Sequence, residues 1–309
     1  MRYFVLTLFF GLTVFAKEPI SPIPLNAPYD KQKALLGYRL FMDPILSSTN
    51  SVACASCHDI FSGGGADRNK VSFGVYNKKG NIQSPTVLNA RYNFKQFWNG
   101  RAQDLYQQAN GPIHNPVELN MTNKDVEKEL SASQLYRSLF LQIYKTNTIQ
   151  FSQVIDAIVE FEKALTTPNS RFDRYLRGEK SLSQDEIDGY TLFKQVGCIT
   201  CHNGINLGGN SMQKIGLFEE YKNQKNYPDL YSITHDPDYK NVFKVPTLRN
   251  ISQTAPYLHD GSAKTLKDSV IAMSRYQLGS TLSNQEIEKI VKFLKTLDGE
   301  TPKILKEKI

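Results

Sequence analysis

The 309-residue sequence is poor in the residues that build chemical sites, with four cysteines, five histidines, five methionines and one tryptophan. It also lacks any block of five like charges, although 37 Lys and Arg outnumber 30 Asp and Glu. Nucleic-acid-binding proteins usually concentrate their positive charge, so this balance does not favour that class of partner. After residue 16 no apolar run approaches the roughly 20 residues that span a bilayer, which excludes a multi-span membrane protein.

The first sixteen residues differ from the rest of the chain. Arg2 precedes an almost wholly apolar stretch, Tyr3–Phe15, and small residues at 14 and 16 suit a cleavage site. We therefore expect residues 1–16 to be a cleaved export signal, which would place the mature protein in the periplasm. The alternative is an uncleaved anchor helix, but an apolar stretch of this length is too short to span a bilayer.

All four cysteines fall in two C-x-x-C-H motifs, Cys54–His58 and Cys198–His202. This is the attachment signature of c-type haem, in which two thiols form thioethers with the haem and the adjacent histidine binds the iron. We therefore expect two covalent haems, on Cys54, Cys57 and His58, and on Cys198, Cys201 and His202. An export signal agrees with this expectation, because bacteria attach haem outside the cytoplasmic membrane.

Three other uses of the cysteines explain the motifs less well. A zinc site built from two C-x-x-C pairs has no need for a histidine after each pair. A redox C-x-x-C motif is not expected twice with a histidine each time. Disulfides within each pair would close loops too short to stabilise the fold.

The two motifs lie in an internal repeat. Gly37–Phe41 precedes the first motif and the similar Gly189–Phe193 precedes the second, and each reads as a helix whose Leu and Phe face a haem. Apolar spacing predicts further helices over 152–165 and around 284–297, and Ser183 with Glu186 and Ser283 with Glu286 form capping boxes. We expect a mainly α fold of two cytochrome c-like domains with long haem-wrapping loops, over residues 17–178 and 179–309.

The second axial ligand of each iron decides between electron transfer and chemistry. For the second haem, Met212 lies only ten residues after His202, whereas Met273 lies far enough along the chain to reach the opposite face. Spacing leaves Met273 either a ligand or an ordinary core methionine. For the first haem no histidine or methionine stands out, which indicates an open site.

Beyond the haem motifs, the mature chain resembles the bacterial di-haem cytochrome c peroxidase family along nearly all of its length. The segments that carry the resemblance are Leu40–Pro44, Ser84–Ala90, Gln96–Ala102, Asn115–Glu118, Pro168–Asp173, Lys244–Asn250 and Pro256–Gly261.

The resemblance implies different roles for the two haems. The N-terminal haem corresponds to the low-potential peroxidatic haem and the C-terminal one to the high-potential electron-accepting haem. Met273 falls on the family's axial methionine, and methionine ligation raises the potential as an electron-storing haem requires. Trp98 falls on the tryptophan between the haems.

The resemblance also implies a catalytic pair and a calcium ion. Glu118 and Gln108 fall on the distal acid–base pair, where a carboxylate moves a proton between the peroxide oxygens and an amide holds the peroxide. A calcium site between the domains would use Gln83, in place of the usual asparagine, with the backbone carbonyls of Thr254 and Pro256.

The chain departs from many family members at one position. A distal histidine on the loop after the first haem blocks the iron in those proteins, and Val75 occupies that position here. Valine cannot bind iron, so we expect a peroxidatic haem that is five-coordinate or water-bound at rest and needs no reductive activation. The neighbouring Tyr76 is a weaker candidate ligand, because the backbone register points it elsewhere.

The resemblance therefore implies a periplasmic peroxidase that reduces hydrogen peroxide with electrons from a small monohaem cytochrome c, as a homodimer. One alternative is the related enzyme that oxidises a protein tryptophan to build a quinone cofactor, but that type uses an axial tyrosine where this chain has Met273. The other alternative is a non-enzymatic di-haem electron carrier, which has no need of Glu118.

Overall fold

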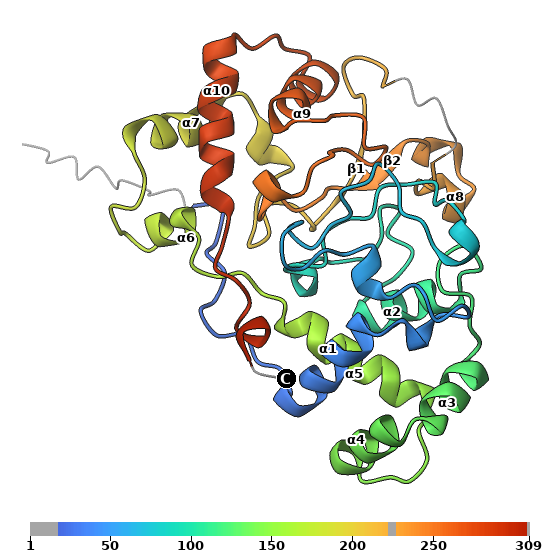
Figure 1. Ribbon diagram of the computed structural model, residues 1–309. Coiled ribbons are helices and arrows are strands. Elements are labelled where there is room, and N and C mark those ends of the chain that lie inside the picture. Colours follow the sequence, from blue (N-terminus) through green and yellow to red (C-terminus); the bar gives the residue numbers. More distant parts are fainter. Residues whose placement is uncertain (1–17, 222–226, 308–309) are drawn as a thin grey trace, which may run out of the picture.

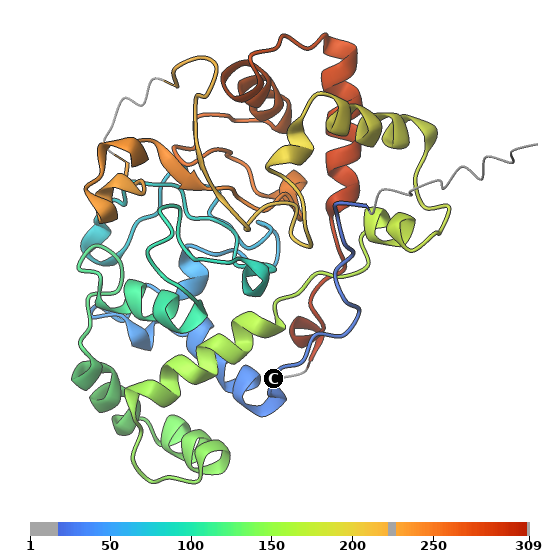
Figure 2. The same ribbon diagram turned by 180° about the vertical axis from the view of Figure 1, so that it is seen from behind.

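The computed structural model describes residues 18–221 and 227–307, and these residues form a mostly helical molecule with a single small sheet (Figures 1 and 2). The expected mainly α fold with long loops is confirmed, while the predicted export signal lies outside the described residues. None of the described helices is long and apolar enough to cross a membrane. In chain order the elements are α1 (Lys31–Met42), α2 (Leu105–His114), α3 (Asn123–Ala132), α4 (Gln134–Tyr144), α5 (Phe151–Ala164), α6 (Arg171–Leu176), α7 (Gln184–Gln195), β1 (Met212–Lys214), α8 (Tyr231–Thr234), β2 (Val242–Lys244), α9 (Leu266–Ala272) and α10 (Asn284–Leu294).

The first half of the chain is organised around α5, which covers the predicted helix at 152–165 within a residue or two. Its apolar side chains recur at helical spacing and are buried against α1 and α2, with α3 and α4 below them in Figure 1. Residues Val154, Ile155, Ile158 and Val159 are all at most 3% exposed. The loops between α1 and α2 carry the first haem motif, so this helical base positions it.

The second half is built on the pair α7 and α10, with α6 and α9 beside them. Both predicted capping boxes are present: the Glu186 side chain accepts from the Ser183 backbone N–H, and Glu286 from that of Ser283. These boxes satisfy free N–H groups at the first turn and so determine where α7 and α10 begin. The second haem motif follows directly from the end of α7.

The repeated glycine explains why the two halves look alike. A Cβ on Gly37 of α1 would lie 1.9 Å from the carbonyl oxygen of Ala157 in α5, and one on Gly189 of α7 would lie 2.1 Å from that of Lys289 in α10. Each glycine therefore lets a haem-side helix cross its partner in backbone contact, which no other residue permits. The phenylalanine of each repeat then reaches the haem side, since Phe41 lies 6.4 Å from the His58 ring and Phe193 lines the second cavity.

The two ends of the chain cross over between the halves. Ile20, near the start, is buried in the core of the second half, whereas Ile304, near the end, is buried against α1 and α5 in the first. Phe172 of α6 also belongs to the second core, although it precedes residue 178. The boundary at 178 thus stays a prediction, because packing mixes segments from both sides of it.

A buried polar network joins the halves through three of the motif segments. The guanidinium of Arg249 pairs with Asp173 at 2.6 Å, and both side chains are fully buried. Asp173 also accepts from the backbone N–H groups of Ile23 and Ser170, while Arg249 donates to the carbonyls of Ser21 and Ile205. Nearby, Thr167 accepts from the side-chain amides of both Asn89 and Asn250. These motif residues therefore join the two halves through a buried ion pair and buried hydrogen bonds.

Replacing Asp173 by asparagine should lower the free energy of unfolding by about 3–5 kcal/mol, because the Arg249 cation would stay buried without an anion. The matched control is Asp185→Asn, which breaks the exposed pair between Asp185 and Lys292 and should change stability by less than about 1 kcal/mol. Denaturant titration of the haem-loaded proteins measures both. Equal losses in the two variants would contradict the proposed role of the buried pair.

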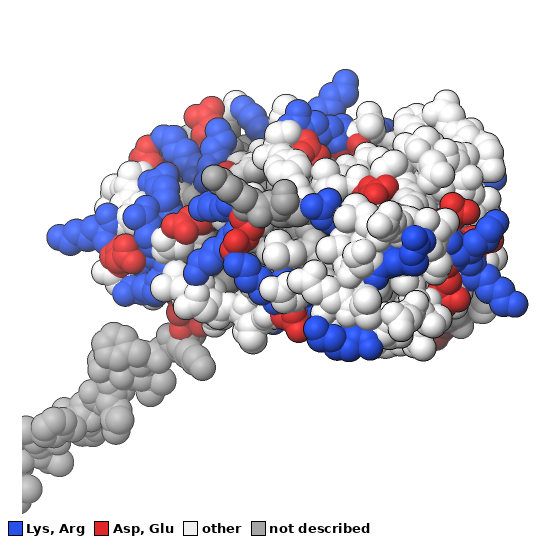
Figure 3. All heavy atoms as spheres, turned by 60° about the horizontal axis from the view of Figure 1, so that its bottom comes forward, with Lys and Arg blue, Asp and Glu red and all other residues white. Residues whose placement is uncertain are grey.

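The surface carries mixed charge. On the face shown in Figure 3, Lys and Arg side chains lie among Asp and Glu, and no broad area of that face is of one sign. Exposed ion pairs such as Arg275 with Glu219 and Lys292 with Asp185 belong to this pattern.

Candidate active site

The two C-x-x-C-H segments adopt the same local fold. Each begins with a short 3-10 turn, Cys54–Ser56 or Cys198–Thr200, and in each the histidine N–H donates to the carbonyl of the first cysteine. All four thiols are free of disulfides. Burial, with smaller contributions from nearby acidic groups, raises the pKa of Cys54 to about 12 and that of Cys57 to about 11. The thiols are thus neutral, enclosed and available for attachment to a haem.

In both motif histidines one ring nitrogen has a backbone partner, which leaves the other free to bind iron. The Nδ1 atom of His58 lies 3.2 Å from the carbonyl oxygen of Gly65, and that of His202 lies 3.1 Å from the carbonyl oxygen of Leu207. Such a partner keeps the proton on Nδ1 and leaves the Nε2 lone pair free for a metal. Burial lowers the pKa of both imidazoles, that of His202 to about 4, so both stay neutral. These observations fit haem iron at both positions.

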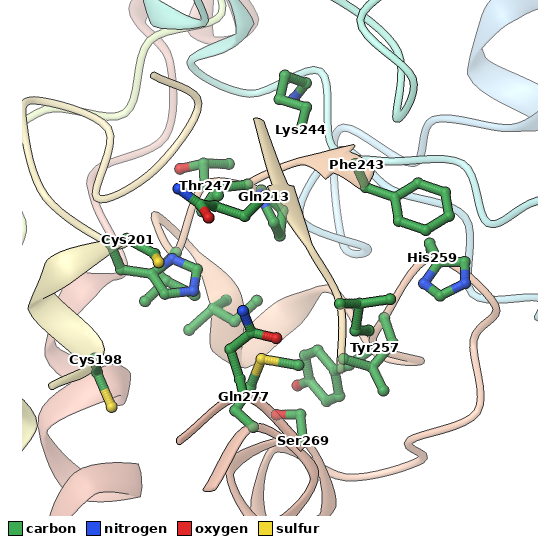
Figure 4. A pocket seen from close by; sticks show the side chains of 18 of the residues that line it. Cys198, Cys201, Gln213, Phe243, Lys244, Thr247, Tyr257, His259, Ser269 and Gln277 are labelled. Carbon is green, nitrogen blue, oxygen red and sulfur yellow. The ribbon is translucent and has the colours of Figure 1, made fainter. Parts of the chain in front are cut away.

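The second motif opens into a cavity of about 240 Å³ (Figure 4). That volume far exceeds the ~10–15 Å³ that a single water needs. Cys198, Cys201 and His202 line one part of it and Met273 another, so the structure brings the predicted methionine and histidine to one cavity. Most of the remaining lining is apolar, as the flat face of a haem requires.

Met273 begins an unusual turn. Residues Met273–Gln277 form a π-helical turn at the end of α9. Such turns are rare, and they occur frequently at functional sites because they redirect side chains out of the helical register. The other candidate, Met212, lies in β1, where its sulfur would be 3.2 Å from a Cβ on Gly100.

Glu118 lies beside the first motif. It follows α2 and is half-buried, and its charge acts on both Cys54 and Cys57. Burial raises the pKa of its carboxyl, while a 2.6 Å hydrogen bond from the Asn115 side chain and the charge of Arg101 oppose that rise. A carboxyl in this setting can take and return a proton nearer to neutral pH than an exposed glutamate.

Gln108 offers an unused acceptor. It lies on α2, its Oε1 atom is buried, and no hydrogen bond reaches that atom from the described residues. A buried amide oxygen without a partner is costly, so an additional donor is expected at this position.

Val75 and Tyr76 differ sharply in their surroundings. Val75 is fully buried, and its N–H donates to the carbonyl of Glu118 at 2.9 Å, which fixes this loop next to the carboxylate. Tyr76 is 65% exposed, and its ring contacts the ammonium of Lys78. The tyrosine side chain therefore lies at the surface.

Trp98 connects the halves. Its indole Nε1 donates to the carbonyl of Gln83, and its own carbonyl accepts from the N–H of Lys244 in β2, both at 2.7 Å. The ring lies 6.2 Å from that of His259, which stacks on Phe243 at 4.2 Å. Trp98 is thus held between the first half and the wall of the cavity.

The predicted calcium ligands lie along one cavity. Gln83, Thr254 and Pro256 all line the cavity, and within the described residues no hydrogen bond reaches the backbone carbonyls of Thr254 and Pro256. The backbone carbonyl of Gln83 already accepts a hydrogen bond from Trp98, and the side-chain oxygen of Gln83 is the predicted ligand. In the described parts of the chain, no group of three His, Cys, Asp or Glu side chains could hold a metal ion. The calcium site stays a prediction.

Sequence reasoning missed three residues of these sites. Asn115 donates a hydrogen bond to Glu118, and the positive charge of Arg101 acts on the same carboxyl. Both residues lie in motif segments whose sequence indicated only the family resemblance. Lys244 is 6% exposed and lines the cavity. The sequence signal for Lys244 was its position between two apolar residues, Phe243 and Val245. The structure shows that β2, which ends at Lys244, is buried along its length.

Comparisons with known proteins agree with this geometry. A family model described as di-haem cytochrome c peroxidase matches residues 31–181, and one described as cytochrome c matches residues 187–298. Cytochrome c551 peroxidase of Nitrosomonas europaea is 45% identical over 93% of this chain and 86% of its own length. The methylamine utilization protein MauG of Methylophilus methylotrophus is more distant, at 31% identity over 93% of this chain and 89% of its own.

The same fold occurs among solved structures. A MauG-like protein associated with microbial copper homeostasis matches with a TM-score of 0.80 and 27% identity, over 95% of this chain and 96% of that one. Together with the two haem motifs, these matches show that the chain belongs to the di-haem cytochrome c peroxidase family of oxidoreductases.

Proposed function

We propose that this protein reduces hydrogen peroxide to water at the N-terminal haem, with electrons that enter through the C-terminal haem. The observation that carries the proposal is the contrast between the two sites. A carboxyl of raised pKa lies near the first motif, and an unpartnered amide oxygen lies on α2, in the same half of the chain, whereas a methionine shares the cavity of the second motif. One site thus has proton-transfer groups and the other has the ligand set of an electron carrier.

When bound, each haem supplies one electron, so that two haems match the two electrons that hydrogen peroxide accepts. His58 and His202 would each bind one of the two irons, and Met273 would be a further ligand of the second iron. Hydrogen peroxide, two reduced cytochromes and two protons then yield two waters and two oxidised cytochromes.

Glu118 moves the proton in this proposal. As a carboxylate it accepts the proton of one peroxide oxygen and returns it to the other, which leaves as water. Asn115 donates to its Oε1 atom and so orients the carboxylate, while the positive charge of Arg101 favours its ionised form. The free Oε1 of Gln108 accepts a hydrogen bond from the remaining peroxide O–H.

In this proposal Val75 determines how the iron of the N-terminal haem is ligated in the resting, oxidised protein. We expect the oxidised protein to show a high-spin EPR signal from the N-terminal haem and to turn over peroxide without prior reduction, because valine offers no ligand atom. Val75→His should convert that signal to low spin and make turnover depend on prior reduction of the C-terminal haem. A wild-type spectrum with only low-spin, doubly ligated haem would contradict this expectation.

The remaining features of the proposal concern partners and location. A small monohaem cytochrome c is the proposed donor, and the protein would act in the periplasm as a homodimer after removal of residues 1–16. Calcium would bind the oxygens of Gln83, Thr254 and Pro256 and so brace the junction at Trp98.

The decisive experiment is peroxide-dependent oxidation of ferrocytochrome c by the purified protein with both haems attached. Turnover supports the peroxidase. Its absence would favour either a di-haem electron carrier or the enzyme type that builds a quinone cofactor from tryptophan. Met273 argues against the latter, because it offers a thioether where that type uses a tyrosine.

A further inference from the structure

The cavity of the second haem motif has a marked charge imbalance. Two lysines, Lys214 and Lys244, line it, and no aspartate or glutamate does so among the described residues. Lys214 is exposed and can be solvated, whereas Lys244 is only 6% exposed. A buried ammonium is retained only if something nearby balances its charge.

Nothing in the described protein balances Lys244. No ion pair or side-chain hydrogen bond involves its ammonium among the described residues, although it is surrounded by the cavity wall and the Trp98 segment. Burial alone lowers the pKa of the amine to about 8, with no contribution from a carboxylate. The partner must therefore come with whatever fills the cavity.

The position of Lys244 is fixed by its backbone. It is the last residue of β2, pairs with Met212 of β1, and donates its N–H to the Trp98 carbonyl at 2.7 Å. Its neighbours Phe243 and Val245 also line the cavity. Figure 4 shows Lys244 among the side chains around this space, together with Gln213 and Thr247.

A haem has the complementary chemistry, since it combines a large apolar face with two propionate carboxylates. We propose that Lys244 is the counter-ion of a propionate on the C-terminal haem, and that its positive charge raises the potential of that haem. This inference rests on the proposed function, in which the C-terminal haem stores the electron. Lys244 acts as a positioning residue there, because its charge changes the electrostatic potential at the haem while its side chain does not contact peroxide.

The test is a spectroelectrochemical titration of both haems in Lys244→Met. Removal of a nearby cation favours the ferric state, so the ferrous-to-ferric ratio of the C-terminal haem at a given potential should fall about tenfold, a shift of about 59 mV for one electron. Lys244→Arg keeps the charge and should stay within threefold of the wild type. The matched control Lys267→Met removes an exposed lysine outside the cavity and should shift the ratio less than twofold.

Three results would overturn the proposal. The first is an unchanged C-terminal potential in Lys244→Met, and the second is a shift confined to the N-terminal haem. The third is a wild-type potential that moves with added inorganic phosphate at constant ionic strength while that of Lys244→Met does not, since this would assign the site to a free anion.

The measurement is independent of turnover. Haem content per chain is determined first, and Lys244→Gln replaces Lys244→Met if the latter fails to load two haems. Because the titration contains no peroxide, a shifted potential would stand even if the peroxidase assay failed, and an active enzyme with unshifted potentials would remove this inference alone.

Discussion

Replacing Glu118 by glutamine is expected to lower kcat for peroxide by about 10²–10⁴-fold, the usual contribution of a positioned general acid–base. Glutamine has the same shape and can still accept the hydrogen bond from Asn115, but it cannot take up the peroxide proton. The measurement is the steady-state oxidation of ferrocytochrome c at saturating peroxide. Undiminished turnover would remove the role assigned to this carboxyl.

A matched control is Glu288→Gln, which changes the same functional group on the exposed side of α10 and should leave kcat unchanged. The haem spectra of both variants should equal those of the wild type. An altered haem spectrum in Glu118→Gln would indicate disturbed haem geometry instead of lost proton transfer.

The pH profile provides a second readout for Glu118. Its ionised form accepts the proton, so kcat/KM should fall as the pH drops through its pKa. Because burial raises that pKa, the fall should begin above the ~4.3 of an ordinary glutamate. This acidic limb should disappear in Glu118→Gln, whatever activity remains.

Replacing Met273 by histidine is expected to lower the midpoint potential of the C-terminal haem by on the order of 0.1–0.3 V, because a thioether ligand favours ferrous iron more than an imidazole does. The electron donor would then no longer reduce this haem readily, and turnover with ferrocytochrome c should fall by at least about tenfold. A spectroelectrochemical titration and the steady-state assay measure the two effects.

Met212→Ala is the control for Met273, since Met212 is the other methionine that follows the second motif. It lies in β1 and should leave the potential unchanged. If Met212→Ala lowered the potential and Met273→His did not, the ligand assignment would have to be exchanged between the two residues.

Local sequence was sufficient for the elements that depend on neighbouring residues. The capping boxes at Ser183 and Ser283, the helix over 152–165 and the two haem turns each rest on contacts within a few residues, and the structure contains all of them. Within these elements, residues that are close in the sequence are also close in space, so a sequence pattern predicts them directly.

Other features depend on contacts between distant segments. The pairing of Arg249 with Asp173 joins residues 76 positions apart, and Ile20 and Ile304 are each buried in the half of the molecule that is more distant from them in the sequence. No local pattern encodes such contacts, because they arise only when both halves pack together.

The sequence by itself therefore determined that this protein carries two c-type haems, since C-x-x-C-H brings thiols and imidazole together within five residues. Only the tertiary structure decided which polar groups are buried around the two haem motifs. Glu118, Gln108 and Lys244 look like ordinary surface residues in the sequence, and they acquire their chemistry through burial. Burial removes the water that would otherwise solvate each group, and it is a property of the whole fold.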